Sequence, residues 1–179
     1  MADRGMTRAA QTLEAVGFTV VRFNFPYRDQ GSGRPDPMPV LKATVAEAAI
    51  RARKELAPRK LIIGGRSMGG RVASMLAADG FECDGLLLLA YPLHPAGQPE
   101  KLRDAHLARI GVPVLCFNGT RDPLCGRDLM ENAIKNLSWQ MHWLEGADHS
   151  FHVLKSSGRT DDQVMQDVGA SAQRWLASL

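Results

Sequence analysis

Short apolar runs that alternate with stretches of helical periodicity constrain the fold of this chain more than any other feature. Residues 60–64 (KLIIG), 85–91 (GLLLLAY) and 113–118 (PVLCFN) are apolar at successive positions, so both faces of each strand are expected to be buried. Strands of this kind, separated by helices, form a parallel sheet that is covered on both sides. The sequence therefore predicts an α/β fold, a three-layer αβα sandwich.

Two further strands and five helices complete the expected order. Residues 18–25 (FTVVRFNF) and 139–144 (WQMHWL) are rich in β-branched or aromatic residues and are predicted to be strands. Together with the three apolar strands they would form a mostly parallel sheet of about five strands. The helices are expected over residues 6–16, 41–56, 68–78, 129–137 and 160–179. In the last of these, Thr160 and Gln163 have the spacing of a capping box.

Length and composition indicate one globular domain over residues 1–179, with no internal repeat or linker. The net charge of +3 is spread along the chain without a Lys/Arg block, so neither nucleic acid nor a membrane is an expected partner. The sequence starts without an apolar signal segment, which is typical of a cytoplasmic protein. Its three cysteines lack metal-like spacing and are expected to be reduced thiols. No metal or other cofactor is expected, and the oligomeric state stays open.

A G-x-S-x-G match, residues 65–69 (GRSMG), lies between an apolar strand and a helix. Gly65 and Gly69 remove side chains that would clash in a sharp strand-to-helix turn, which would present the Ser67 hydroxyl at the start of the helix. The helix N-terminus favours developing negative charge there. The five residues alone are weak evidence, because Gly and Ser are common in such turns.

A serine nucleophile needs a base, and the base needs an orienting acid. Asp122 follows the strand PVLCFN and His149 follows WQMHWL, so both lie in loops at the carboxyl edge of the sheet, where Ser67 also lies. The strand-end rule thus supplies the three residues in the chain order Ser, Asp, His. We therefore predict Ser67 as nucleophile, Asp122 as acid and His149 as base.

Other residues near these positions fit less well. His142 lies inside a predicted strand, and Asp148 adjoins His149 too closely to orient its ring, so a turn-making role is expected for it. The remaining histidines lie in loops: His94, His106 and His152. A phosphate-binding loop over residues 64–71 is disfavoured because the Lys-Ser/Thr ending and the glycine spacing of such loops are missing.

The motifs GGRSMGGR, RFNFPY, YPLHPAGQPEKLR, GTRDPL and GADHSF together resemble the α/β-hydrolase superfamily, from about Met6 to the C-terminus. More narrowly, the chain is similar to a small lidless branch of predicted, dienelactone-hydrolase-like hydrolases. The resemblance implies the same roles for Ser67, Asp122 and His149. Dienelactone hydrolases proper carry a cysteine at the elbow, so a lactone substrate is not implied.

One element of that family is missing from the sequence. In α/β-hydrolases the strand before the first helix ends in a His-Gly-type turn, whose loop supplies one oxyanion N–H, while the residue after the nucleophile, here Met68, supplies the other. In the strand order of that family, the missing strand would lie in the middle of the sheet, between the strands predicted over residues 18–25 and 60–64. Either the native chain starts upstream of Met1, or residues 18–25 pair directly with 60–64. In the second case Tyr27 or Arg28 would be the substitute donor.

These observations predict a serine hydrolase that cleaves a small ester or related acyl substrate through an acyl-enzyme, with Met68 N–H in the oxyanion hole. Two alternatives stay open: a catalytically impaired interaction module of the same fold, and a phosphate- or nucleotide-binding protein that uses the glycine loop. Arg66 and Arg71, on either side of the elbow, are expected to be surface or salt-bridged arginines.

Overall fold

The centre of the computed structural model, which describes residues 4–179, is a parallel sheet of four strands in the order β1-β2-β3-β4. Each strand pairs in parallel with its neighbour, with Gly64 opposite Leu87 in the first pair. The strands are β1 (Ile62–Arg66), β2 (Gly85–Leu89), β3 (Val114–Gly119) and β4 (Trp139–Leu144). The predicted α/β class with a parallel sheet is confirmed.

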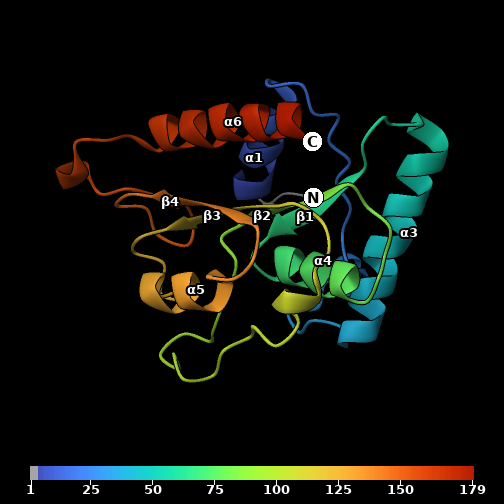
Figure 1. Ribbon diagram of the computed structural model, residues 1–179, viewed down its shortest axis with the longest axis horizontal. Coiled ribbons are helices and arrows are strands. Elements are labelled where there is room, and N and C mark those ends of the chain that lie inside the picture. Colours follow the sequence, from blue (N-terminus) through green and yellow to red (C-terminus); the bar gives the residue numbers. More distant parts are fainter. Residues whose placement is uncertain (1–3) are drawn as a thin grey trace.

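Helices cover both faces of the sheet, as Figure 1 shows. One face carries α1 (Arg4–Glu14) and α6 (Asp161–Ser178), and the other carries α3 (Met38–Leu56), α4 (Met68–Ala78) and α5 (Arg127–Ile134). Three short elements lie in the connections: α2 (Pro26–Asp29), η1 (Leu107–Arg109) and η2 (Lys155–Ser157).

The central strands are buried on both faces, as their continuous apolar sequences predict. In β2, Leu86 and Leu88 pack into the core beneath α3, α4 and α5, whereas Leu87 and Leu89 pack into the core beneath α1 and α6. None of the four leucines is more than 5% exposed. Because successive side chains of a strand point to opposite faces of the sheet, this one strand contributes to both hydrophobic cores.

The last helix begins at the predicted cap. The Thr160 side chain accepts the N–H of Gln163, and the Gln163 side chain accepts the N–H of Thr160, which satisfies two backbone donors at the start of α6. β1, by contrast, begins two residues later than predicted, because the Asp84 carboxylate accepts the Leu61 N–H at 2.6 Å before the strand pairing starts.

The prediction of a strand over residues 18–25 is wrong, and the sheet has four strands rather than about five. Phe18 and Val20 pack against the core of α1 and α6, whereas Phe25 packs against the core of α3 and α4. The segment thus passes from one layer to the other at the β1 side of the sheet and forms no ladder with it. Its β-branched and aromatic residues are used for packing, not for strand pairing.

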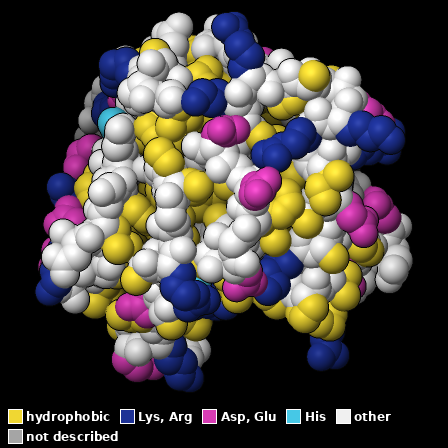
Figure 2. Space-filling model, turned by 45° about the vertical axis from the view of Figure 1, so that its right-hand side comes forward, with side chains coloured by type: hydrophobic (Ala, Val, Ile, Leu, Met, Phe, Trp, Pro, Cys, Tyr) yellow, Lys and Arg dark blue, Asp and Glu magenta, His cyan; other side chains and the backbone are white. Residues whose placement is uncertain are grey.

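The face on the α3 side displays apolar side chains, as Figure 2 shows. Val21 and Phe23 of the layer-crossing segment are 49% and 41% exposed, and Val40, Ile50 and Leu56 of α3 are also exposed. Within β1 itself Gly64 is exposed, unlike any residue of β2 or β3. This difference follows from the position of β1 at the end of the strand order.

Within residues 4–179, no helix combines the length and apolar character needed to cross a bilayer. Cys83, Cys116 and Cys125 are all free thiols, and the latter two are buried. Burial raises the pKa of the Cys116 and Cys125 thiols, which keeps both protonated. The described residues contain no group of three His, Cys, Asp or Glu side chains that could hold a metal ion.

Candidate active site

Ser67 occupies a sharp turn between β1 and α4. Its backbone lies at φ +53° and ψ −120°, a region that residues with a side chain rarely adopt, and α4 begins at the next residue, Met68. The Ser67 N–H donates to the Leu89 carbonyl at 2.8 Å, which ties the turn to the end of β2. The strained serine is therefore held at the carboxyl edge of the sheet.

Two glycines make the turn possible, although they are not quite the two that the motif indicated. A Cβ on Gly65 would lie 3.0 Å from the Gly69 carbonyl carbon, and a Cβ on Gly70 would lie 2.7 Å from the Gly65 oxygen. A Cβ on Gly69 would meet nothing within 4 Å. The close approach of strand and helix thus excludes side chains at Gly65 and Gly70, while Gly69 contributes only its backbone.

The three residues predicted for catalysis lie in a hydrogen-bonded row. The Ser67 hydroxyl is 2.9 Å from Nε2 of His149, and Nδ1 of the same ring is 2.8 Å from Oδ2 of Asp122. An ionised carboxylate only accepts, so Nδ1–H donates to Asp122 and Nε2 is left to accept the serine proton. The Asp122 side chain has no exposed surface, whereas that of His149 is 22% exposed.

The Asp122 carboxylate is fixed by neighbouring donors. The Leu124 N–H donates to Oδ1 at 2.8 Å, and the Asn118 side-chain amide donates to Oδ2 at 3.2 Å. Asn118 also bonds the N–H and the C=O of Tyr91, at 3.1 and 3.0 Å, beyond the end of β2. Its side chain therefore connects the candidate acid to the neighbouring strand.

Sequence reasoning placed Asn118 at the sheet edge but gave it no role. One signal was available, because Asn118 is the only polar residue in the apolar strand PVLCFN. A polar side chain that is fully buried needs hydrogen-bond partners, and Asn118 is 0% exposed. The identity of those partners depends on the tertiary structure.

The His149 loop is shaped by Asp148, which has the turn-making role expected of it. Its Oδ1 accepts the N–H of Ser150 at 2.7 Å and of His152 at 3.0 Å. On the other side, Nη2 of Arg66 donates to the His149 carbonyl oxygen at 3.1 Å. Arg66 is thus half-buried between the elbow and the histidine loop.

The N–H group predicted for the oxyanion hole lies at the start of α4. Met68 is the first residue of α4, so its N–H has no acceptor inside the helix and lies directly after Ser67. The prediction that Tyr27 or Arg28 supplies the second donor required residues 18–25 to pair with β1. It is wrong, because these residues do not pair with β1. In addition, the Tyr27 N–H donates to Asp36 at 2.9 Å and the Arg28 N–H donates to the Phe25 carbonyl at 2.9 Å.

The other histidines have local partners away from this row. His142 stacks on Phe117 within the sheet, with ring centroids 5.3 Å apart, and burial lowers its pKa. His152 pairs with Asp161, and His94 accepts the Gly126 N–H at 3.1 Å.

A second contact between a serine and a histidine lies inside the protein. Nε2 of His106 is 2.8 Å from the Ser74 hydroxyl, and Ser74 is 0% exposed. Burial, and then the nearby charges of Arg71 and Arg109, lowers the pKa of His106 to about 4. This pair has the distance of a nucleophile and its base, but the Ser74 side of it has no contact with solvent.

A nucleophile-elbow serine at the edge of a parallel sheet, with Asp and His on later loops in that order, defines the α/β-hydrolase class. The sequence matches the alpha/beta hydrolase domain family over residues 1–177. The chain belongs to this family.

Solved structures of similar fold include a serine hydrolase without a lid from Xanthomonas campestris, at 23% identity and a TM-score of 0.76, with 98% of this chain and 75% of that chain covered. An alpha-beta serine hydrolase homologue from Coxiella burnetii has 19% identity and a TM-score of 0.74, with coverage of 98% and 77%. Est1E from Butyrivibrio proteoclasticus has 14% identity and a TM-score of 0.71, with coverage of 99% and 82%.

Proposed function

We propose that the protein is a serine hydrolase that cleaves small esters through Ser67, His149 and Asp122. The observation that carries the proposal is the unbroken row of hydrogen bonds, 2.9 Å from serine to histidine and 2.8 Å from histidine to aspartate. Membership of the alpha/beta hydrolase family supports the reaction class. The similarity to a serine hydrolase without a lid supports an open site that admits small, accessible esters.

The reaction is acyl transfer to water in two steps. Ser67 Oγ attacks the ester carbonyl carbon while its proton moves to Nε2 of His149, and the leaving alcohol departs with that proton as the C–O bond breaks. Water then gives a proton to Nε2 and attacks the acyl-enzyme, which releases the acid and returns the proton to Ser67. Asp122 holds the imidazole in the tautomer that accepts the serine proton.

The charge that develops on the carbonyl oxygen needs donors, and the Met68 N–H at the N-terminus of α4 is the one assigned here. Loss of one oxyanion donor lowers the turnover number of a serine hydrolase by a factor of about 10²–10³. With Met68 as the assigned donor, we expect modest turnover numbers on simple esters.

A second candidate is an interaction module of the same fold with impaired catalysis. One observation favours it. The Tyr27 and Arg28 N–H groups, which were the candidates for the second oxyanion donor, are hydrogen-bonded to other groups. Such a protein would fold normally and would leave acyl substrates unchanged.

A serine-directed fluorophosphonate probe separates these functions. We expect labelling of the folded wild type, mapped to Ser67 by mass spectrometry, and its loss in Ser67→Ala. Ser74→Ala is the matched control, because Ser74 also lies 2.8 Å from a histidine but is buried, so this variant should still be labelled. Absence of labelling in folded wild type would reject the hydrolase and support the module.

A further inference from the structure

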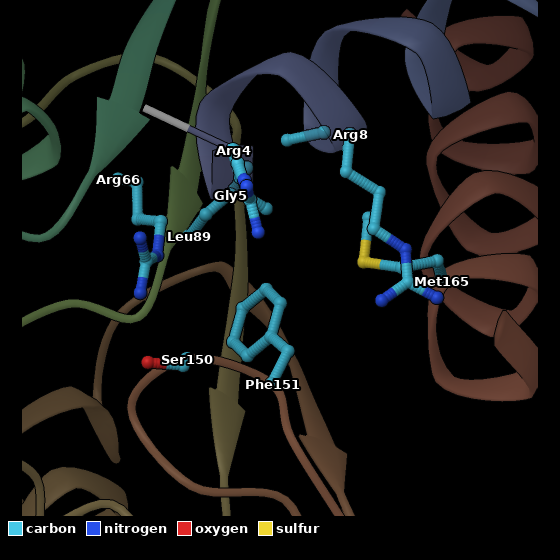
Figure 3. Close-up of a pocket in the computed structure, with 9 residues that line it drawn as sticks. Arg4, Gly5, Arg8, Arg66, Leu89, Ser150, Phe151 and Met165 are labelled. Atoms are coloured by element: carbon cyan, nitrogen blue, oxygen red, sulfur yellow. The ribbon is translucent and has the colours of Figure 1, made fainter. Parts of the chain in front are cut away.

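The loops that follow β2 and β3 meet on the face of the sheet opposite α1. On the α1 side, Figure 3 shows a hollow of about 150 Å³ whose lining includes Arg66 and Ser150 but none of the three residues of the candidate catalytic row. On the opposite side, Leu93 of the loop after β2 and Cys125 of the loop after β3 pack into the core beneath α3, α4 and α5. The loop that carries Asp122 is therefore packed against the loop after β2.

His94 lies in the loop after β2 and is only 5% exposed. Its Nε2 accepts the Gly126 N–H at 3.1 Å, and its Nδ1 lies 2.9 Å from the Pro95 carbonyl oxygen. A carbonyl oxygen only accepts hydrogen bonds, so Nδ1 carries the hydrogen and Nε2 is the accepting nitrogen. Both ring nitrogens are thus bonded to backbone groups, which fix the orientation and the tautomer of the ring.

The backbone of His94 holds the same loop after β3. Its N–H donates to the Leu124 carbonyl oxygen at 3.0 Å, while the Leu124 N–H donates to Oδ1 of Asp122 at 2.8 Å. Leu124 is therefore held by His94 through one polar group and holds the candidate acid through the other. Because the ring of His94 bonds Gly126, its ring and its backbone fix both ends of residues 124–126.

Each oxygen of the Asp122 carboxylate is thus connected to the chain segment after β2. Oδ2 accepts from Asn118, whose amide is bonded to the backbone beyond the end of β2, and Oδ1 accepts from Leu124, which His94 holds. The Asp122 side chain has no exposed surface, so its oxygens depend on these protein donors. A shift of Leu124 would move the carboxylate relative to the His149 ring.

Building on the proposed hydrolase function, we propose that His94 is a positioning residue for Asp122. Its ring and its N–H keep residues 124–126 where the Leu124 N–H meets Oδ1, and the carboxylate then keeps the His149 imidazole in line with the serine. His94 acts through the acid and takes no proton itself, because its hydrogen bonds go to backbone groups.

Asn and Gln at position 94 form a matched pair of variants, because both carry an amide and differ by one methylene group. The Gln oxygen can reach the position of Nε2 and accept the Gly126 N–H, whereas the Asn amide ends near the position of Nδ1. With nitrophenyl acetate as substrate, His94→Asn should lower kcat by about 10- to 100-fold with little change in KM. His94→Gln should keep kcat within about threefold of the wild-type value.

The turnover number is measured per reactive serine, titrated with the fluorophosphonate probe, so that unfolded protein does not count. His142→Asn is the control, because it also removes a half-buried imidazole, but one that stacks on Phe117 within the sheet, and it should keep the wild-type kcat. Amide hydrogen exchange adds a readout that needs no activity. The Leu124 and Gly126 N–H groups should exchange faster in His94→Asn than in His94→Gln, and equal exchange rates would contradict the proposal.

A double-mutant cycle separates positioning of the acid from a general loss of stability. If His94 acts through Asp122, His94→Asn should lower kcat by less than about twofold in the Asp122→Asn background, because the acid has already lost its function. Equal kcat in His94→Asn and His94→Gln, or the full loss again in the double variant, would overturn the positioning role and leave the hydrolase intact. If the folded wild type neither hydrolyses the ester nor reacts with the probe, the hydrolase proposal itself fails, and this inference with it.

Discussion

Asn118 donates its side-chain N–H to Oδ2 of Asp122 at 3.2 Å, and the same oxygen is the one that meets the His149 ring. Because the same amide also bonds both backbone polar groups of Tyr91, the position of the candidate acid is linked to the end of β2. Ala90, the residue before Tyr91, has φ +51°, so the contacts of Asn118 with Tyr91 lie next to a strained backbone position.

Replacing Asn118 by Ala should lower kcat by about 10- to 100-fold with little change in KM, because the acid would lose a positioning contact. The free energy of unfolding should fall by about 1–3 kcal/mol, since buried polar groups of Tyr91 lose their partner. Steady-state kinetics and denaturant unfolding measure the two effects. Asn132→Ala, an exposed position on α5, should change neither. A folded Asn118→Ala enzyme with wild-type kcat would refute the positioning role.

Asp122→Asn should reduce kcat by about 10³–10⁴, because an amide does not hold the imidazole in the tautomer that accepts the serine proton. The neighbouring acid provides the control. Asp148 accepts the Ser150 and His152 N–H groups through Oδ1, which an asparagine oxygen can also do, so Asp148→Asn should lose less than about tenfold. Ester hydrolysis rates under saturating substrate distinguish the two variants, and comparable losses would place the acid elsewhere.

Ser67→Gly should be more stable than Ser67→Ala by about 1 kcal/mol, because glycine adopts φ +53° and ψ −120° without steric cost whereas alanine keeps the Cβ. Both variants should be inactive, so the comparison isolates the backbone strain stored at the elbow. Thermal or denaturant unfolding of the two inactive proteins provides the measurement. Equal stabilities would mean that the turn relaxes when the hydroxyl is removed.

Burial lowers the pKa of His106 to about 4 in the folded protein, against about 6.5 in an unfolded chain. Between these values the unfolded state binds a proton that the folded state does not, so stability should fall as pH drops from about 7 to about 4. The contribution amounts to at most about 3 kcal/mol. His106→Gln should flatten this part of the curve of unfolding free energy against pH. Parallel curves for the two proteins would exclude His106 as the source.

Gly119→Ala should destabilise the fold by several kcal/mol, because the added Cβ would lie 2.2 Å from the Ala147 carbonyl oxygen and would push apart the ends of the Asp122 and His149 loops. Gly111→Ala is the matched control, since a Cβ there meets nothing within 4 Å and φ is not positive. Urea midpoints compare the two variants. A stable Gly119→Ala protein would show that these loops can separate without cost.

Local sequence patterns determined much of the architecture. Apolar runs predicted strands that are buried on both faces, and the capping box fixed the start of α6 at Thr160. The G-x-S-x-G match, followed by Asp122 and His149 at strand ends, predicted which side chains would lie at one edge. These inferences succeeded because periodicity, capping and the common edge of parallel strands depend on short segments and on chain order.

Tertiary structure decided what those patterns left open. Residues 18–25 have strand-like composition but cross between the two hydrophobic cores, because strand formation needs a partner ladder that local sequence does not specify. Arg66 bonds the His149 carbonyl, and Asn118 connects Tyr91 to Asp122. Such contacts join residues that are distant in the chain or lie on neighbouring strands. They exist only after the sheet has brought the strand ends together.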